Sequence, residues 1–261
     1  MADLAALLAD FDAECADLEA LVAPLDDWSI PTPAPGWDIA TQIAHLAWTD
    51  EVSVIAATQP ERFAELLVEI APRAFTFVDE AAFELAKLPR AELLARWRAG
   101  RKALVEALAA VPDGTKLPWF GPPMAPASMI SARIMETWAH GQDVADALGV
   151  KRTPTARLKT VAHISVRARN YAYTVHGEAG PTEEFRVELT APDGSLWTWG
   201  AETAAQRVTG PAEDFCLVAT QRRHRDDTAL RTEGDDTEHW LTIAQAFAGP
   251  PGQGREAGQF T

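Results

Sequence analysis

The chain is poor in cysteine and has no long apolar run. These two absences argue against a disulfide-bonded protein and against a membrane-spanning one. Its 261 residues contain only two cysteines, Cys15 and Cys216, which lie far apart. Such a pair is more typical of two buried thiols than of a disulfide, in keeping with a reducing compartment. The longest apolar stretches, such as 103–111, fall well short of the roughly 20 residues that a membrane-spanning helix needs. We therefore expect no transmembrane segment.

Basic residues are also scarce, and the first residues carry none. The stretch 1–10 lacks the basic start and small-residue cleavage site of a secretory signal, so we expect a cytoplasmic protein. With 38 acidic and 23 basic residues, the formal net charge is −15. Most of the surface would repel a polyanion, which makes nucleic acid a poor candidate partner. One basic cluster, 221–225, is followed at once by Asp226 and Asp227, and it has the charge to hold a small anion.

The first 150 residues are predicted to be almost entirely helical. Apolar residues recur there at three- and four-residue spacing without sustained alternation. Asp38 is a candidate N-cap, Gly149 a candidate C-cap, and Pro72 should bend the third helical region. The expected helices are 4–22, 39–58, 61–87, 90–110 and 127–148, with proline-rich loops at 28–36 and 118–126.

The pattern changes after Pro154, where alternating residues predict strands. Segments 185–189 and 196–199 flank an Ala-Pro-Asp-Gly turn and form a predicted hairpin, with a third strand at 206–209. Helices are expected at 157–175, 211–220 and 238–248, and a loosely ordered tail after Gly249. The fold class is therefore α + β, with a helical domain over 1–150 and a smaller α+β domain over 151–261.

Three side chains form a candidate metal site. Glu136 and His140 are four residues apart on one predicted helix, so they share a face. His45 lies in the apolar run Ile-Ala-His-Leu-Ala-Trp of another helix, where an imidazole needs a reason to be buried. Two histidines and one carboxylate suit Zn²⁺ with a fourth position open, and also Fe²⁺ or Ni²⁺.

The residues alone leave a second interpretation open. His45 would then be a core histidine satisfied by a backbone carbonyl, and Glu136 and His140 would pair with each other as a structural ion pair. Spacing and composition do not decide between the two interpretations.

Motifs in both halves of this predicted site resemble a known family. They are the helix start 36–40 (Gly-Trp-Asp-Ile-Ala), His45 followed by Leu46, and the run 133–143 (Arg-Ile-Met-Glu-Thr-Trp-Ala-His-Gly-Gln-Asp). Together they resemble the mycothiol-dependent maleylpyruvate isomerase family, within the DinB-like metalloenzyme superfamily. The likeness covers about residues 1 to 150, and the remainder is more faintly similar to the smaller α+β domain of that family.

The resemblance implies an up-down four-helix bundle of the DinB-like type. It also implies a zinc ion held by His45, Glu136 and His140, and a low-molecular-weight thiol, typically mycothiol, bound to the metal as its thiolate. Segments 221–227 and 240–251 look like a subfamily of unassigned reaction, so isomerisation of maleylpyruvate is not carried over. Similar C-terminal sequences carry a wyosine-base-formation label, but the acidic charge argues against a tRNA substrate.

Five further residues are candidates for the site, and most have a plain structural alternative. Arg222 and Asp143 are predicted to be catalytic, and Arg222, Arg223 and Trp37 to bind the thiol cosubstrate. Guanidinium groups grip carboxylates in two-point contacts, but exposed charge pairs are commonplace. Asp143 would accept a hydrogen bond from a ligand imidazole, or else be a solvated charge or a bundle ion pair. Arg133 would orient Glu136 or pair with an acid on a neighbouring helix.

The expected function is that of a zinc-dependent thiol transferase or isomerase acting on a small anionic substrate, with no membrane partner. Neither a Ser-His-Asp signature, nor a phosphate-cradling glycine loop, nor a paired-cysteine metal site is present. Bundles of this kind often dimerise, so a homodimer is compatible with the resemblance. The alternatives are a non-catalytic metal-containing module for small-molecule binding or stress response, and an interaction scaffold with a vestigial site.

Overall fold

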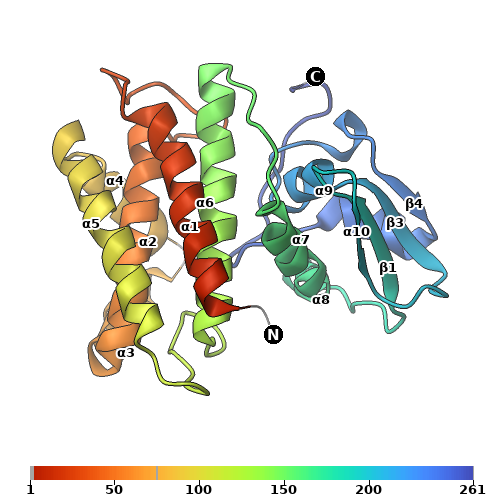
Figure 1. Cartoon of the computed structure of the whole chain (residues 1–261), viewed down its shortest axis with the longest axis horizontal. Coiled ribbons are helices and arrows are strands. Elements are labelled where there is room, and N and C mark those ends of the chain that lie inside the picture. The colour runs from red at the N-terminus through yellow and green to blue at the C-terminus, as the bar shows by residue number, and fades with distance from the viewer. Residues whose placement is uncertain (1–2, 75, 261) are drawn as a thin grey trace. The chain divides into compact units, whose positions relative to one another are not determined.

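The chain folds into two compact units, each with its own core. The computed structural model describes residues 3–74 and 76–260. The units are Met1–Arg152 and Thr153–Thr261, drawn in Figure 1. None of the helices in the described ranges is both long enough and apolar enough to cross a bilayer.

Four long helices form the bundle of the first unit. They are α1 (Leu4–Val22), α2 (Ile39–Thr58), α5 (Arg90–Ala109) and α6 (Pro126–Leu148). Helix α2 packs against α5 and α6, and α1 packs against α6 (Figure 1). Phe11, Ile43 and Trp97 are fully buried between them. The structure confirms these four predicted helices and the bundle that they form.

The region 61–87, predicted to be one helix bent at Pro72, consists of two separate helices. It consists of α3 (Pro60–Ile70), a 3₁₀ turn η1 (Ala71–Arg73) and α4 (Phe77–Leu85). Pro72 has no backbone N–H to donate and restricts the residue before it, which explains why the α-helical ladder stops there. Helix α3 buries Phe63 against Val52 and Ala56, and α4 packs on α2.

A four-stranded sheet forms the centre of the second unit, in the order β2-β1-β3-β4. Strand β1 (Phe185–Thr190) pairs antiparallel with β2 (Leu196–Trp199), as the hairpin prediction required, and parallel with β3 (Gln206–Pro211). Strand β4 (Arg231–Glu233) pairs antiparallel with β3. Strand β4 was not predicted, because its three residues, Arg-Thr-Glu, contain no alternating apolar pattern.

Helices cover one face of this sheet. Helix α9 (Ala212–Ala219) contacts β1 and β3, and α10 (Asp235–Ile243) contacts β3 and β4. Phe185, Phe215 and Trp240 meet there, with ring centroids 5.7 Å apart on each side of Trp240. The second unit is completed by α7 (Leu158–Arg167), α8 (Arg169–Val175) and a 3₁₀ turn η2 (Arg225–Asp227).

Two helix predictions in the second unit are wrong in extent. The segment 157–175 is two helices, α7 and α8, separated at Ala168. The last helix begins at Asp235, after Gly234 with its φ of 95°, and ends at Ile243 rather than at 248. Its first turn carries Asp235, Asp236 and Glu238, and acidic side chains stabilise a helix N-terminus. The apolar pattern alone placed this helix three residues too late.

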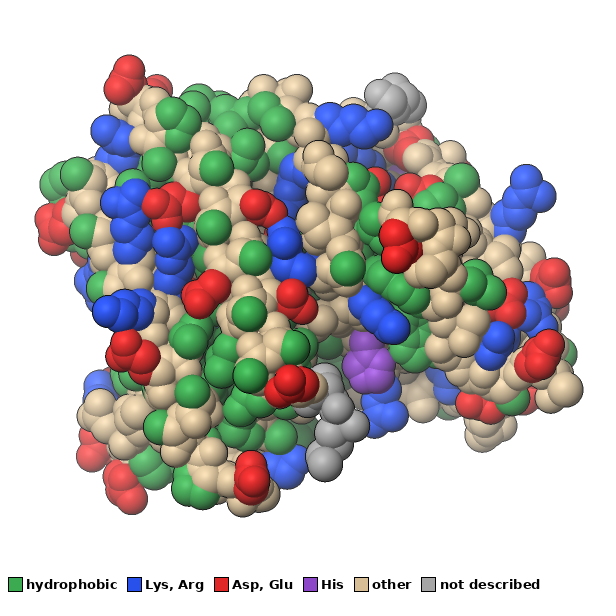
Figure 2. Space-filling view, in the orientation of Figure 1, with side chains coloured by type: hydrophobic (Ala, Val, Ile, Leu, Met, Phe, Trp, Pro, Cys, Tyr) green, Lys and Arg blue, Asp and Glu red, His purple; other side chains and the backbone are tan. Residues whose placement is uncertain are grey.

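Surface charge on the bundle is mixed. On the face drawn in Figure 2, acidic and basic side chains are interspersed over the bundle helices. Arg98 and Arg101 of α5 both bind Glu19 of α1, and Arg96 of α5 binds Glu51 of α2. Exposed pairs of this kind contribute about 0–1 kcal/mol each, so the apolar core carries most of the stability.

A buried ion pair joins α2 to α6. Arg133 Nε donates to Asp50 Oδ1 at 2.9 Å, and both side chains are almost fully buried. Burial raises the pKa of Asp50, and the attraction of the Arg133 guanidinium opposes that rise. This contact decides between the two roles considered for Arg133, because the guanidinium pairs with an acid on the neighbouring helix.

Replacing one member of this pair should destabilise the bundle strongly. We expect Arg133→Met to lower the free energy of unfolding by about 3–5 kcal/mol, because the Asp50 carboxylate would stay buried without a partner. Urea unfolding of the metal-free protein measures the change. The double variant Asp50→Leu/Arg133→Met should recover most of the loss, since it removes both charges. An unchanged unfolding midpoint for Arg133→Met would show that the pair is not needed.

Candidate metal centre

The start of α2 is held by its cap and by the preceding loop. Asp38 Oδ1 accepts a hydrogen bond from the backbone N–H of Thr41 at 2.8 Å. Asp38 is therefore the N-cap of α2, as predicted. The N–H of Ile39 bonds to the carbonyl of Ile30 at 3.1 Å and ties the loop to the helix. These contacts fix where α2 begins, and therefore which face of it carries His45.

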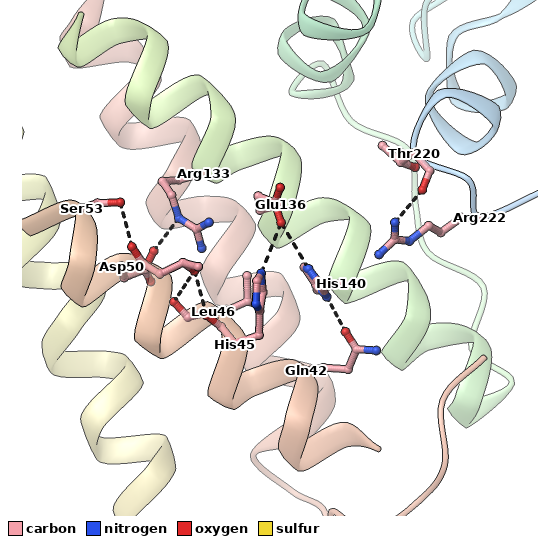
Figure 3. A network of polar contacts seen from close by, with 11 residues as sticks. Gln42, His45, Leu46, Asp50, Ser53, Arg133, Glu136, His140, Thr220 and Arg222 are labelled. Atoms are coloured by element: carbon pink, nitrogen blue, oxygen red, sulfur yellow. Dashed lines mark hydrogen bonds and ion pairs between the residues drawn. The ribbon is translucent and has the colours of Figure 1, made fainter. Parts of the chain in front are cut away.

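Helix α6 supplies the other two donors. It starts with Pro126 in its first turn and ends at Gly149, whose φ of 64° is the left-handed C-cap predicted from the sequence. Glu136 and His140 lie one turn apart on the side of α6 that faces α2 (Figure 3). The predicted i, i+4 arrangement is present.

The three predicted ligands converge on a single carboxylate oxygen. Glu136 Oε2 lies 3.4 Å from His45 Nε2 and 3.2 Å from His140 Nε2. All three donor atoms lie within 4.8 Å of one another. Ligand bonds of about 2.0–2.1 Å in a tetrahedral zinc site place neighbouring donor atoms roughly 3.3 Å apart. The spacing of these donors therefore fits one divalent ion.

The cluster lies at the edge of the core rather than deep inside it. The His45, His140 and Glu136 side chains are 9%, 12% and 22% exposed. Burial alone would raise the pKa of Glu136, but hydrogen bonding to His140 and His45 outweighs it and holds the pKa well below the usual value. The carboxylate is thus anionic at neutral pH, as a metal ligand must be.

Contacts of the two imidazoles weigh against the structural alternative for His45. His45 Nδ1 is buried and has no hydrogen-bond partner among residues 3–74 and 76–260, so no backbone carbonyl satisfies it there. Its Nε2 points to the same carboxylate oxygen as His140. Glu136 and His140 do contact each other, as the structural alternative proposed. The same Glu136 oxygen, however, also contacts His45, the third candidate ligand.

Gln42 is a site residue that sequence analysis missed. Its Oε1 accepts a hydrogen bond from His140 Nδ1, on the side of the ring away from Glu136 (Figure 3). Gln42 is fully buried in an apolar run, three residues before His45. Those two facts were a usable signal, because a buried amide requires polar partners.

Trp37 lies against both imidazoles. Its ring centroid is 5.8 Å from that of His140, with the planes nearly parallel at 16°, and 5.4 Å from that of His45. Phe83 of α4 also contacts Trp37, edge-on, with ring centroids 6.3 Å apart. Trp37 was predicted to bind the thiol cosubstrate, but Phe83, which lies on α4 after the break at Pro72, was not anticipated.

Asp143 is fully buried on α6. Full burial excludes the solvated surface charge considered for it. The Nδ1 contact of His140 is with Gln42, so Gln42 is the acceptor that orients this imidazole. The catalytic assignment of Asp143 stays a prediction.

Arg222 and Arg223 belong to the second unit. The backbone leaves α9 through Gln221, whose φ of 61° is the only positive value of a non-glycine residue in the described ranges. Arg222 Nη1 donates to the Thr220 carbonyl, and the Arg223 guanidinium lies 4.4 Å from the Phe260 ring centroid. The tail expected to be loose therefore contacts this loop. The assignments of both arginines to substrate or thiol stay predictions.

Fold and site together define a class, and comparison with known proteins gives the family. The class is a four-helix bundle with two histidines and a glutamate placed to hold a divalent metal. The chain belongs to the mycothiol maleylpyruvate isomerase N-terminal domain family, whose model matches residues 11–145. A second model, described as wyosine base formation, matches residues 181–233 in the other unit.

Two proteins are similar to this chain in sequence, and two solved structures are similar to it in fold. Two uncharacterized proteins of Mycobacterium tuberculosis, from two strains, are 57% identical over 257 residues, which is 98% of this chain and all of each relative. Crystal structures of a mycothiol-dependent maleylpyruvate isomerase and its mutant match with TM-scores of 0.59 and 0.62. They cover 88% of this chain and 92% of theirs at 15% and 16% identity, so they establish a shared fold.

Removal of one donor should abolish tight metal binding. We expect His45→Ala purified from zinc-supplemented medium to contain far less than stoichiometric metal, because two donors from one helix turn leave the ion under-coordinated. Elemental analysis after dialysis against a weak chelator measures the content. His163→Ala, which removes a histidine of the second unit, is the matched control and should keep its metal. Stoichiometric metal in His45→Ala would refute the ligand set.

Proposed function

We propose that this protein is a metal-dependent enzyme that uses a low-molecular-weight thiol, mycothiol, in a transfer, addition or isomerisation reaction on a small anionic substrate. The observation that carries the proposal is the convergence of His45, Glu136 and His140 from two helices with the spacing of metal ligands. Family membership supports the choice of thiol, since the matching model is named for mycothiol maleylpyruvate isomerase.

His45, Glu136 and His140 would hold the ion, and Zn²⁺ suits two imidazoles and a carboxylate with a further position open. A divalent ion held there would lower the pKa of a coordinating thiol and so supply a nucleophilic thiolate at neutral pH. The remaining exposure of Glu136 and His140 supports an approach path for a small ligand.

The protein's own residues supply the surroundings. Trp37 and Phe83 form an apolar wall beside the donors, which excludes water from that side and offers a flat surface to a bound molecule. Asp143, three residues after His140, is proposed to act as a catalytic carboxylate. Arg222 and Arg223 are proposed to bind anionic groups of the thiol or of the substrate, as guanidinium groups do.

A thiol titration tests the proposal directly. In protein loaded with Co²⁺ in place of zinc, mycothiol should change the visible spectrum, with an intense new band from sulfur coordination and saturation at one thiol per site. His45→Ala carried through the same loading is the control and should give no band. Protein that holds one Co²⁺ per chain without responding to mycothiol would refute thiol use and favour the non-catalytic binding module.

The aromatic wall should affect thiol binding more than metal binding. We expect Trp37→Leu to weaken mycothiol binding about 3- to 10-fold, which corresponds to the roughly 0.5–1.5 kcal/mol of a specific aromatic contact. Zinc affinity, measured by chelator competition, should stay close to that of the unmodified protein. Phe63→Leu, which alters an aromatic residue of α3 that is buried against α2, is the matched control and should change neither affinity. Equal mycothiol affinity in Trp37→Leu and the parent would contradict this role.

A further inference from the structure

A chain of hydrogen bonds runs from His140 to the loop before α2. His140 Nδ1 bonds to Gln42 Oε1, and Gln42 Nε2 donates to Thr32 Oγ1 at 2.9 Å. Thr32 Oγ1 then donates to the backbone carbonyl of Trp37 at 2.9 Å. The same carbonyl also accepts the backbone N–H of Thr32 at 2.8 Å. Two side chains, Gln42 and Thr32, thus connect a candidate ligand to the residue that stacks on it.

The Trp37 carbonyl at the end of this series of hydrogen bonds determines which group donates and which accepts in each of them. A carbonyl oxygen only accepts hydrogen bonds, so the Thr32 hydroxyl must donate its single proton to the Trp37 carbonyl. The Thr32 oxygen can therefore only accept from Gln42, which turns the amide nitrogen of Gln42 toward Thr32. The amide oxygen of Gln42 is then left facing His140, and it needs a proton on His140 Nδ1.

This polarity fixes the place of one proton on His140. Nε2 of the same ring hydrogen-bonds to Glu136 Oε2 at 3.2 Å; if a metal ion took the place of that Nε2 proton, the proton held on Nδ1 would leave the Nε2 lone pair for the ion. That is the tautomer a metal ligand requires. His45 Nδ1, in contrast, has no partner in the described parts of the chain. Of the two imidazoles, only His140 therefore has a side-chain acceptor at Nδ1 within residues 3–74 and 76–260.

We infer that Gln42 is a positioning residue for the metal centre, which selects the Nε2-ligating tautomer of His140 and couples it to the Trp37 loop through Thr32. This inference rests on the proposed metal site. Gln42 acts through its acceptor oxygen and touches neither the ion nor the substrate. Loss of the acceptor should therefore weaken metal binding without unfolding the bundle.

Three variants separate the acceptor from simple packing. Gln42→Leu removes the acceptor, and we expect its zinc dissociation constant to rise roughly 10- to 100-fold, the usual effect of losing an outer partner of a ligand histidine. Gln42→Glu keeps an acceptor and should bind zinc at least as tightly as the parent. Thr32→Val cuts the far end of the chain but leaves Gln42 Oε1 in place, so its effect should be smaller than that of Gln42→Leu.

Gln142→Leu is the matched control. Gln142 is also a buried glutamine, on α6, but it donates to Asp146 rather than contacting an imidazole. Its replacement should leave zinc affinity unchanged. Chelator competition with zinc alone gives the dissociation constants, and thermal unfolding of the metal-free proteins shows whether any variant is generally destabilised.

Proton exchange gives a readout that a packing role would not move. In the zinc-loaded protein, the His140 Nδ1 proton should exchange slowly with solvent in nuclear magnetic resonance spectra, and faster in Gln42→Leu. Equal zinc affinity in Gln42→Leu and the parent overturns the inference, as does equal weakening in Gln42→Leu, Gln42→Glu and Gln142→Leu. If the unmodified protein binds no zinc, the proposed function itself fails and the inference falls with it.

Discussion

The packing of α2 against α6 is the constraint on which the site depends. Three polar contacts follow one another along this interface: Gln42 with His140, His45 with Glu136, and Asp50 with Arg133. Moving along α2 toward its end means moving along α6 toward its start, as antiparallel helices require (Figure 3). A shift of either helix by one turn would break all three contacts at once, so the buried ion pair also maintains the register of the proposed ligands.

The two imidazoles of the site differ in the contacts of their Nδ1 atoms. On α6, Glu136 and His140 share one helix turn, and Gln42 holds the far nitrogen of His140. On α2, His45 reaches the same carboxylate but has an unpartnered Nδ1 within the described ranges. Trp37 packs on both rings and belongs to the loop that Thr32 and Gln42 tie down. Rigidity of the loop and orientation of the ligand are thus linked physically.

Sequence patterns predicted most of the secondary structure because apolar periodicity is a local property. Helices α1, α2, α5 and α6 and the β1–β2 hairpin follow such patterns closely. Failures occurred where tertiary contacts decide. Strand β4 exists because β3 offers it an edge, and α10 starts early because acidic residues and Gly234 favour a helix start. The effect of Pro72 was recognised, but whether a proline bends or breaks a helix depends on what each half packs against.

By itself, the sequence determined the donor types and half of their geometry. The spacing of Glu136 and His140 places them on one face of any helix, and a buried His45 in an apolar run needs a polar partner. Only the tertiary structure decided that His45 meets that pair and that Gln42 is the group that orients His140. It also decided that the second nitrogen of His45 has no backbone carbonyl as partner within residues 3–74 and 76–260. The physical reason is range: helix periodicity acts over a few residues, whereas these contacts join positions more than 90 residues apart and exist only once α2 packs on α6.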